Sequence, residues 1–258
     1  MDTFVTTIDP QVILILLAAG FVAAFIDSVV GGGGLISLPT FLLVGLPPHL
    51  ALGTNKLAGT VCSLTSFLSF LRSGKIRLDI IKYLFWLSLA GSVAGAYIVQ
   101  QIPPVFLRPL VISLLVLVAF YTFLRKNWGT NSRYTGLSAG MAVLAGLMAV
   151  ALGFYDGFFG PGAGSFLLFG FLFFGFDFVE ASGNAKALNF ASNIGSLATF
   201  VLLGAVQYVY GLTMGIGMMI GACIGSQVAI RKGSTYVRPL FLGVTVAMIS
   251  KQIWDLLQ

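Results

Sequence analysis

Long apolar runs separated by short polar loops follow one another along almost the whole chain. Most of them approach the roughly 20 residues that a helix needs to cross a bilayer. The pattern therefore predicts an all-α integral membrane protein with about eight to ten transmembrane segments. The runs fall at about 11–30, 34–46, 50–72, 79–100, 104–124, 136–158, 162–176, 180–203, 209–230 and 237–257.

Two of these runs, 34–46 and 162–176, are too short to cross a membrane upright. At 1.5 Å per residue each reaches only about 20 Å as a helix. Each also follows a glycine cluster. They are either tilted short spans or half-helices that break inside the membrane, which is tolerated where protein or a water-filled cavity covers the freed backbone groups.

The chain contains the same stretch twice, at 25–77 and again at 154–207. Each copy has an aspartate, a glycine cluster, a short apolar run and then a lysine. The copies are about 129 residues apart before the apolar run and about 130 after it. Paired breaks in corresponding positions of two halves are typical of a transporter site near the bilayer midplane.

The basic residues predict the orientation of the two copies. Most of them gather in the loops at 72–82, 125–133 and 231–238, which the positive-inside rule places in the cytoplasm. Basic residues 74–77 of the first copy align with neutral residues 204–207 of the second. The copies therefore face opposite ways, which predicts two inverted-topology repeats.

This topology gives one transmembrane domain over residues 1–258, with both termini outside the cell. Repeat 1 covers about 11–124, repeat 2 about 136–257, and a cytoplasmic linker about 125–135 joins them.

Composition supports a membrane protein and excludes other classes. The chain is 58% hydrophobic and 9% charged, whereas a soluble domain carries about 25% charged residues. The excess of Lys and Arg over Asp and Glu, 14 against 8, lies in short loops, so we expect no nucleic-acid partner. The expected partners are the lipid bilayer and a small anionic substrate, and the sequence leaves a homodimer open.

Lys56 and Lys186 are the strongest functional signal, because a lysine at the centre of a membrane helix costs about 2.5–3.5 kcal/mol on insertion scales. We favour ammonium groups that neutralise an anionic substrate. One alternative is a structural salt bridge within each repeat, from Lys56 to Asp27 and from Lys186 to Asp156. Another is that both lysines reach towards the membrane surface, since they lie near the starts of their segments.

Asp27 and Asp156 stand just before the glycine clusters. Each is interpreted either as a protonatable group coupled to transport or as a carboxylate that caps the next helix or pairs with a lysine. Together with the two lysines, the four formal charges sum to zero, so the aspartates also provide charge balance.

The glycine clusters and the polar residues around the lysines complete the candidate site. No strand and no phosphate-loop motif accompanies the glycines, which argues against nucleotide binding. They allow either close helix packing or an unwound hinge whose N–H groups face an anion, and we favour the hinge. The expected substrate-binding residues beside the lysines are Gly32, Gly33, Gly34, Thr54, Asn55, Ser66, Gly162, Gly164, Asn184, Asn189 and Asn193.

No sequence motif indicates an enzyme. The chain has a single histidine, and its two cysteines, Cys62 and Cys223, form no metal-binding spacing and are interpreted as packing residues. Hydrolase motifs are absent from the sequence. We therefore expect no catalytic residues, no cofactor and no metal.

The two motifs together resemble the sulfite exporter TauE/SafE family, also called the toluene sulfonate uptake permease family. The resemblance covers nearly the whole chain. It implies a small bacterial inner-membrane transporter of two related halves, whose cargoes are sulfite, sulfoacetate, other organosulfonates and thiosulfate. The alternatives are a passive anion channel and a transporter of another small organic anion. The residues that carry the resemblance are Asp27–Pro39, Gly53–Lys56, Gly153–Ser165, Ala185–Lys186 and Asn189–Gly195.

Overall fold

The computed structural model describes residues 9–103, 105–106, 134, 136 and 138–233. The run expected at 237–257, most of the run expected at 104–124, most of the central linker and both chain ends lie outside this part. Everything described is helix, turn or loop, so the all-α prediction is confirmed for these residues.

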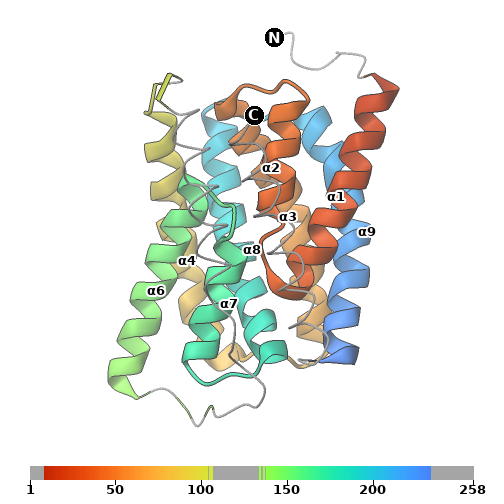
Figure 1. Ribbon diagram of the computed structural model, residues 1–258. Helices are drawn as coiled ribbons and strands as arrows, with labels where there is room; N and C mark the ends of the chain where they lie inside the picture. The colour runs from red at the N-terminus through yellow and green to blue at the C-terminus, as the bar shows by residue number, and fades with distance from the viewer. Residues whose placement is uncertain (1–8, 104, 107–133, 135, 137, 234–258) are drawn as a thin grey trace, which may run out of the picture.

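The described residues form eight helices (Figure 1). Four of them, α1, α4, α6 and α9, are long and apolar enough to cross a membrane. Helices α3 and α8 have 25 residues each but are more polar. The bounds are α1 Pro10–Val30, α2 Gly34–Leu43, α3 Pro48–Arg72, α4 Leu78–Gln100, α6 Ala139–Phe158, α7 Ala163–Phe173, α8 Phe178–Leu202 and α9 Tyr208–Lys232.

Local sequence signals explain where several helices begin. Asp9 caps α1 by accepting a hydrogen bond from the Gln11 amide at 2.9 Å, and proline follows it at the first helical position. Ser138 caps α6, and Asp177 caps α8 through the amides of the next turn. Helix α1 ends at Gly31, whose φ of 77° favours glycine.

Helices α2 and α7 have 10 and 11 residues, slightly fewer than the apolar runs that predicted them. They therefore extend only about 15–17 Å, which is half the thickness of a hydrocarbon core. In Figure 1, α2 lies in the upper half of the molecule and α7 in the lower half. The breaks before them touch, since a Cβ atom on Gly34 would lie 2.9 Å from Cα of Pro161.

The helices associate as two bundles (Figure 1). The first bundle contains α1, α2, α3 and α9, and the second contains α4, α6, α7 and α8. The most extensive helix contacts are α1 with α9 and α4 with α6. The last described helix of each copy thus packs with two helices of the other copy: α4 with α6 and α8, and α9 with α1 and α3.

Glycines bring the main helices of each bundle into backbone contact. A Cβ atom at any of these positions would collide with a main-chain carbonyl oxygen of the facing helix. Small residues that let backbones approach this closely are the usual basis of helix association in membranes. The glycines concerned are Gly217, Gly221 and Gly225 on α9, Gly91 and Gly95 on α4, and Gly153 and Gly157 on α6.

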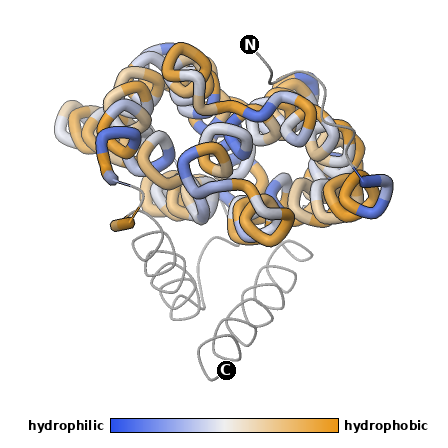
Figure 2. The backbone as a smooth tube through the Cα atoms, turned by 90° about the horizontal axis from the view of Figure 1, so that it is seen from above, coloured by the Kyte–Doolittle hydropathy of each residue, from blue (hydrophilic) through white to orange (hydrophobic). Residues whose placement is uncertain are grey.

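The two bundles meet mainly along α3 and α8, a contact that we call the central interface. Its packing involves side chains as well as small residues: a Cβ atom on Gly59 would lie 2.8 Å from Oδ1 of Asn193. The outer surface is largely hydrophobic, as Figure 2 shows along the helices, and α1, α4, α6 and α9 expose many large apolar side chains. The polar residues are therefore concentrated between the bundles.

The backbone contact between α4 and α6 predicts that Gly153→Ala destabilises the protein. The new methyl group would meet the backbone of Ser88, and overpacking of this kind costs about 1–3 kcal/mol. Gly140→Ala in the same helix is the matched control, because a Cβ atom there has open space around it. Thermal unfolding in detergent should show a lower midpoint for Gly153→Ala only; equal midpoints would contradict the packing account.

Candidate functional site

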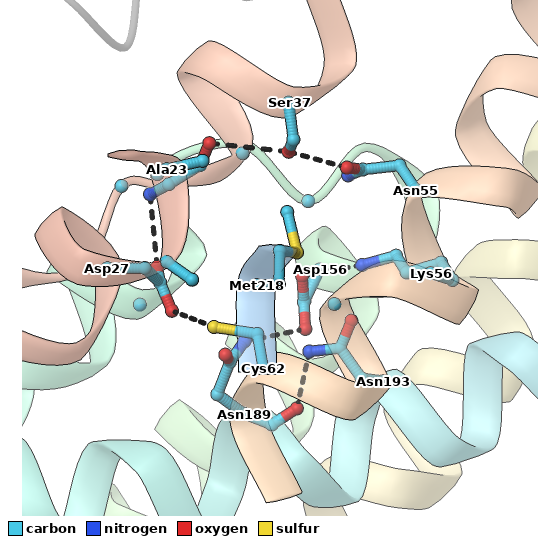
Figure 3. A pocket seen from close by; sticks show the side chains of 18 residues that line it. Ala23, Asp27, Ser37, Asn55, Lys56, Cys62, Asp156, Asn189, Asn193 and Met218 are labelled. Carbon is cyan, nitrogen blue, oxygen red and sulfur yellow. Dashed lines mark hydrogen bonds and ion pairs between the residues drawn. The ribbon is translucent and has the colours of Figure 1, made fainter. Parts of the chain in front are cut away.

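A cavity lies between the two bundles, where the glycine breaks meet the middle of α3 and α8 (Figure 3). It contains about 440 Å³ of space free of atoms, part of which is open to solvent. Its polar lining residues are Asp27, Ser37, Asn55, Lys56, Cys62, Asp156, Asn189 and Asn193.

Each buried lysine pairs with the aspartate of the other repeat. Nζ of Lys56 lies 2.6 Å from Oδ1 of Asp156, and Nζ of Lys186 contacts Oδ2 of Asp27. The alternative pairing considered from the sequence, within each repeat, is therefore wrong. The reason is tertiary: α3 of the first bundle packs against α8 of the second, so each lysine faces the opposite bundle.

These ion pairs are buried to different extents. The side chains of Lys56, Lys186 and Asp156 are at most 3% exposed, whereas that of Asp27 is 15% exposed. Neither lysine is directed to the membrane surface, which excludes that interpretation for this structure. A buried charge is tolerated only when it is paired and hydrogen-bonded, and both pairs meet this condition.

Asp156 has further donors beside Lys56. Its Oδ2 accepts hydrogen bonds from Nδ2 of Asn189 at 3.1 Å and from the hydroxyl of Ser192. All three donors lie on helices packed around the end of α6. Both carboxylate oxygens are thereby held.

Asp27 has weaker additional partners. Its Oδ1 accepts a hydrogen bond from the Gly33 amide at 3.0 Å, and the thiol of Cys62 lies 3.7 Å from Oδ2. The Gly33 amide belongs to the first glycine break. Asp27 thus holds the backbone just before α2 and pairs with a lysine, the second of which is one of the interpretations made from the sequence.

The glycine breaks surround the charged groups. The five glycines expected at the site, Gly32, Gly33, Gly34, Gly162 and Gly164, all line the cavity. At Gly160 a Cβ atom would lie 2.8 Å from Nζ of Lys56, so a larger residue would displace the ammonium. Gly162 has a φ of 84°, which lets the chain turn into α7.

The structure places three of the expected polar ligands at the cavity. Asn55 lines it and accepts a hydrogen bond from the hydroxyl of Ser37 at 2.6 Å. Asn189 and Asn193 line it from α8, and Nδ2 of Asn193 donates to the Asn189 carbonyl at 2.7 Å. These groups could turn donors towards an oxyanion, as expected from their residue types.

Four other expected residues lie behind the cavity surface. Thr54 accepts a hydrogen bond from the Gln207 amide and Asn184 one from the Arg77 amide, both at 2.9 Å. These two bonds attach the start of α9 to α3 and the start of α4 to α8. Ser66 bonds to Ser28 at 2.7 Å, and Lys186 lies behind Asp27.

The different position of Thr54 has a simple geometric reason. One residue along a helix corresponds to a rotation of about 100°, so Asn55 faces the cavity while Thr54 faces α9. Asn184 lies two residues before Lys186 on α8, a rotation of about 200°, so the two side chains leave the helix on nearly opposite sides. Spacing from the lysine alone therefore assigned these two residues to the wrong face.

Sequence reasoning missed several residues of the site. Ser37, Met218 and Ser192 were not selected, and Cys62 was interpreted only as packing. Cys62 is buried at the cavity, whereas Cys223 is exposed. The repeat alignment held a usable signal, because Cys62 and Ser192 occupy corresponding positions of the two copies.

Within the described ranges, no group of three or more His, Cys, Asp or Glu side chains is placed to hold a metal ion. The cavity instead presents the Lys56 ammonium, three amide side chains and the Ser37 hydroxyl beside the carboxylates of Asp27 and Asp156. The ammonium and amide groups are hydrogen-bond donors of the kind that a small anion requires.

Helices that can cross a membrane and a polar cavity with buried charges define the class of protein, a membrane transporter. The family model for the sulfite exporter TauE/SafE matches residues 16–251, and the chain belongs to this family.

The chain is also similar to bacterial proteins described as probable membrane transporter proteins. It is 38% identical to the ORF9 protein of a Sinorhizobium species, over 93% of this chain and 92% of that protein. It is 38% identical to a protein of Haemophilus influenzae, over 95% and 96%. It is 35% identical to YfcA of Escherichia coli K12, over 99% and 95%. No solved structure matches the chain.

The crossed ion pairs predict which double substitutions restore stability. Lys56→Met leaves the Asp156 carboxylate buried without its cation, and such a loss costs about 3–5 kcal/mol. Adding Asp156→Asn removes the uncompensated charge and should raise the melting temperature in detergent again. The control Lys56→Met with Asp27→Asn should melt lower than Lys56→Met alone; rescue by this second pair would indicate pairing within one repeat.

Proposed function

We propose that this protein is a secondary transporter of small sulfur-containing oxyanions, such as sulfite and organosulfonates, in a bacterial cytoplasmic membrane. The observation that carries the proposal is the cavity between the bundles, lined by Lys56, amide side chains and two glycine breaks. Membership in the TauE/SafE family supports both the class of protein and the choice of cargo.

The donors at the cavity fit an oxyanion chemically. A sulfite or sulfonate group has three oxygens that accept hydrogen bonds in different directions. An ammonium group provides three donors, and the amides of Asn55, Asn189 and Asn193 provide more. The starts of α2 and α7 add partial positive charge, because both helices begin at glycine breaks that line the cavity.

We further propose that the two copies are inverted repeats and that transport follows alternating access. In Figure 1, α1 runs downwards and α6 runs upwards, as inverted copies would. Close backbone contacts hold the main helices of each bundle together, whereas at the central interface α3 and α8 also meet through side chains, such as that of Asn193 against Gly59. Rocking about this interface would expose the cavity first to one side and then to the other.

The charge balance suggests how transport is coupled. Two lysines and two aspartates give a net charge of zero at the empty site, so a bound monovalent anion adds one negative charge. Uptake of a proton by Asp27 or Asp156, or entry of a cation, would restore neutrality. We propose that one of these carboxylates provides this coupling.

Counterflow in proteoliposomes loaded with sulfite tests the transport function. Wild type should take up labelled sulfite faster when unlabelled sulfite is inside. In Lys56→Ala and Lys186→Ala this uptake should fall at least tenfold. Each substitution removes a positive charge that stabilises the bound anion by about 1.4 kcal/mol or more. Lys82→Ala, which changes an exposed lysine near the start of α4, is the control and should transport normally.

Uptake without stimulation by internal sulfite would instead indicate a channel, and no uptake would direct the search to other anions. Asp27→Asn and Asp156→Asn, assayed over a range of pH, identify the coupling group. If a variant keeps the full pH dependence of wild type, the substituted aspartate is not the group that couples protons to transport.

A disulfide across the central interface tests alternating access. Gly59 on α3 faces the side chain of Asn193 on α8, since a Cβ atom on Gly59 would lie 3.5 Å from Cγ of Asn193, so cysteines introduced at both positions would face each other across the interface. In a background with Cys62→Ala and Cys223→Ala, oxidation of this double variant should stop counterflow, and reduction should restore it. The bridge prevents the bundles from moving relative to each other.

The matched control is a bridge within the second bundle, between Gly170→Cys on α7 and Met148→Cys on α6. A Cβ atom on Gly170 would lie 3.4 Å from Cγ of Met148, a nearly equal separation. Oxidation of this pair should leave counterflow unchanged. If the bridge across the central interface also leaves transport intact, the bundles do not rock along α3 and α8.

A further inference from the structure

The two lysine–aspartate pairs occupy corresponding positions of the two copies but have different surroundings. Asn189 and Ser192, which hold Asp156, correspond to Gly59 and Cys62 of the first copy. At the Asp27 site the amide is thus replaced by a residue without a side chain, and the hydroxyl by a thiol. A thiol is a much weaker hydrogen-bond donor than a hydroxyl.

We propose that the two pairs have separate roles: the Lys56–Asp156 pair stays closed and positions Lys56, whereas the Lys186–Asp27 pair opens when the anion binds. The proposal rests on the transport function proposed above and deepens it, because it assigns the step at which the anion is admitted.

The fixed pair is supported by the hydrogen bonds and burial of Asp156. Both of its oxygens have strong donors, and its side chain is only 3% exposed. Separating it from Lys56 would leave a buried carboxylate without its cation. Lys56 can nevertheless reach an anion, because it lines the cavity and an ammonium has three donors, of which Asp156 uses one.

The opening pair is supported by the position of Asp27. Its side chain is 15% exposed and lines the cavity, while Lys186 does not line it. An anion that enters the cavity therefore meets the Asp27 carboxylate in front of the Lys186 ammonium. Besides Lys186, this carboxylate is held by one backbone amide and a distant thiol. Moving the Asp27 carboxylate therefore breaks weaker hydrogen bonds than moving the Asp156 carboxylate would.

The other charged and titratable groups around Asp27 do not replace these contacts. Helices α2 and α7 contain no titratable side chain. Helix α9 contributes Met218 to the cavity, and its charged residues, Arg231 and Lys232, are exposed in the last turn. From α3 and α8, the groups nearest Asp27 are Cys62 and Lys186.

Exchanging one atom between the two copies tests the proposal. Cys62→Ser gives Asp27 the hydroxyl donor that Asp156 has, so the Lys186–Asp27 pair should open less readily. The half-saturating sulfite concentration in counterflow should rise on the order of fivefold, as expected when a weak thiol contact is replaced by one ordinary hydrogen bond. Ser192→Cys is the matched control and should change this concentration by a smaller factor than Cys62→Ser does.

A measurement without cargo keeps the test independent of the transport proposal. In the empty protein in detergent, Asp156→Asn should lower the melting temperature more than Asp27→Asn, because it disturbs the more strongly held pair. Equal losses, or a larger loss for Asp27→Asn, would overturn the proposal whatever anion is carried. So would a larger sulfite effect of Ser192→Cys than of Cys62→Ser. If wild type fails to transport sulfite, the proposed cargo is wrong, and the melting comparison still decides the roles of the pairs.

Discussion

The two lysine–aspartate pairs place four formal charges inside a protein whose outer surface is largely apolar. Each charge is tolerated because its partner lies within contact distance, and each partner belongs to the other bundle. The glycine breaks, the small residues around them and the polar positions of α3 and α8 all make room for this arrangement. At Gly160, for example, a methyl group would already occupy space needed by the Lys56 ammonium. The ion pairs therefore constrain both the packing and the chemistry of the cavity.

Helix contacts within a bundle differ from those between the bundles, and this difference indicates where the protein could move. Within a bundle, glycines bring backbones together, and a helix cannot shift there without breaking many close contacts at once. Between the bundles, the contacts include ion pairs, amides and hydroxyls, and some of these groups could exchange a protein partner for a bound anion. Thr54 and Asn184 strengthen the contrast, because they fix α9 and α4 within their own bundles.

Much of the fold was predictable from the sequence, because hydropathy and helix breaks act locally. The two short helices, the glycine breaks and the four buried charges follow from residues that are close together in the chain. The partner of each lysine was not predictable in this way, because it depends on which helix lies opposite α3. The roles of Thr54 and Asn184 were missed for a related reason: neighbouring residues on a helix face different surroundings, and only the packing of α9 and α4 shows which face meets the cavity.

The crossing of both ion pairs between the bundles links charge to movement. If each lysine were paired with the aspartate of its own repeat, both partners would lie in one bundle, and relative motion of the bundles would leave the pairs undisturbed. In the structure, both ion pairs instead join the two bundles, so any relative motion along the central interface changes the surroundings of all four charges. A negative charge supplied by a bound anion can compensate a lysine during this motion, whereas an empty cavity cannot. The crossed pairs thus provide a physical reason why movement of the bundles and occupation of the site should depend on each other.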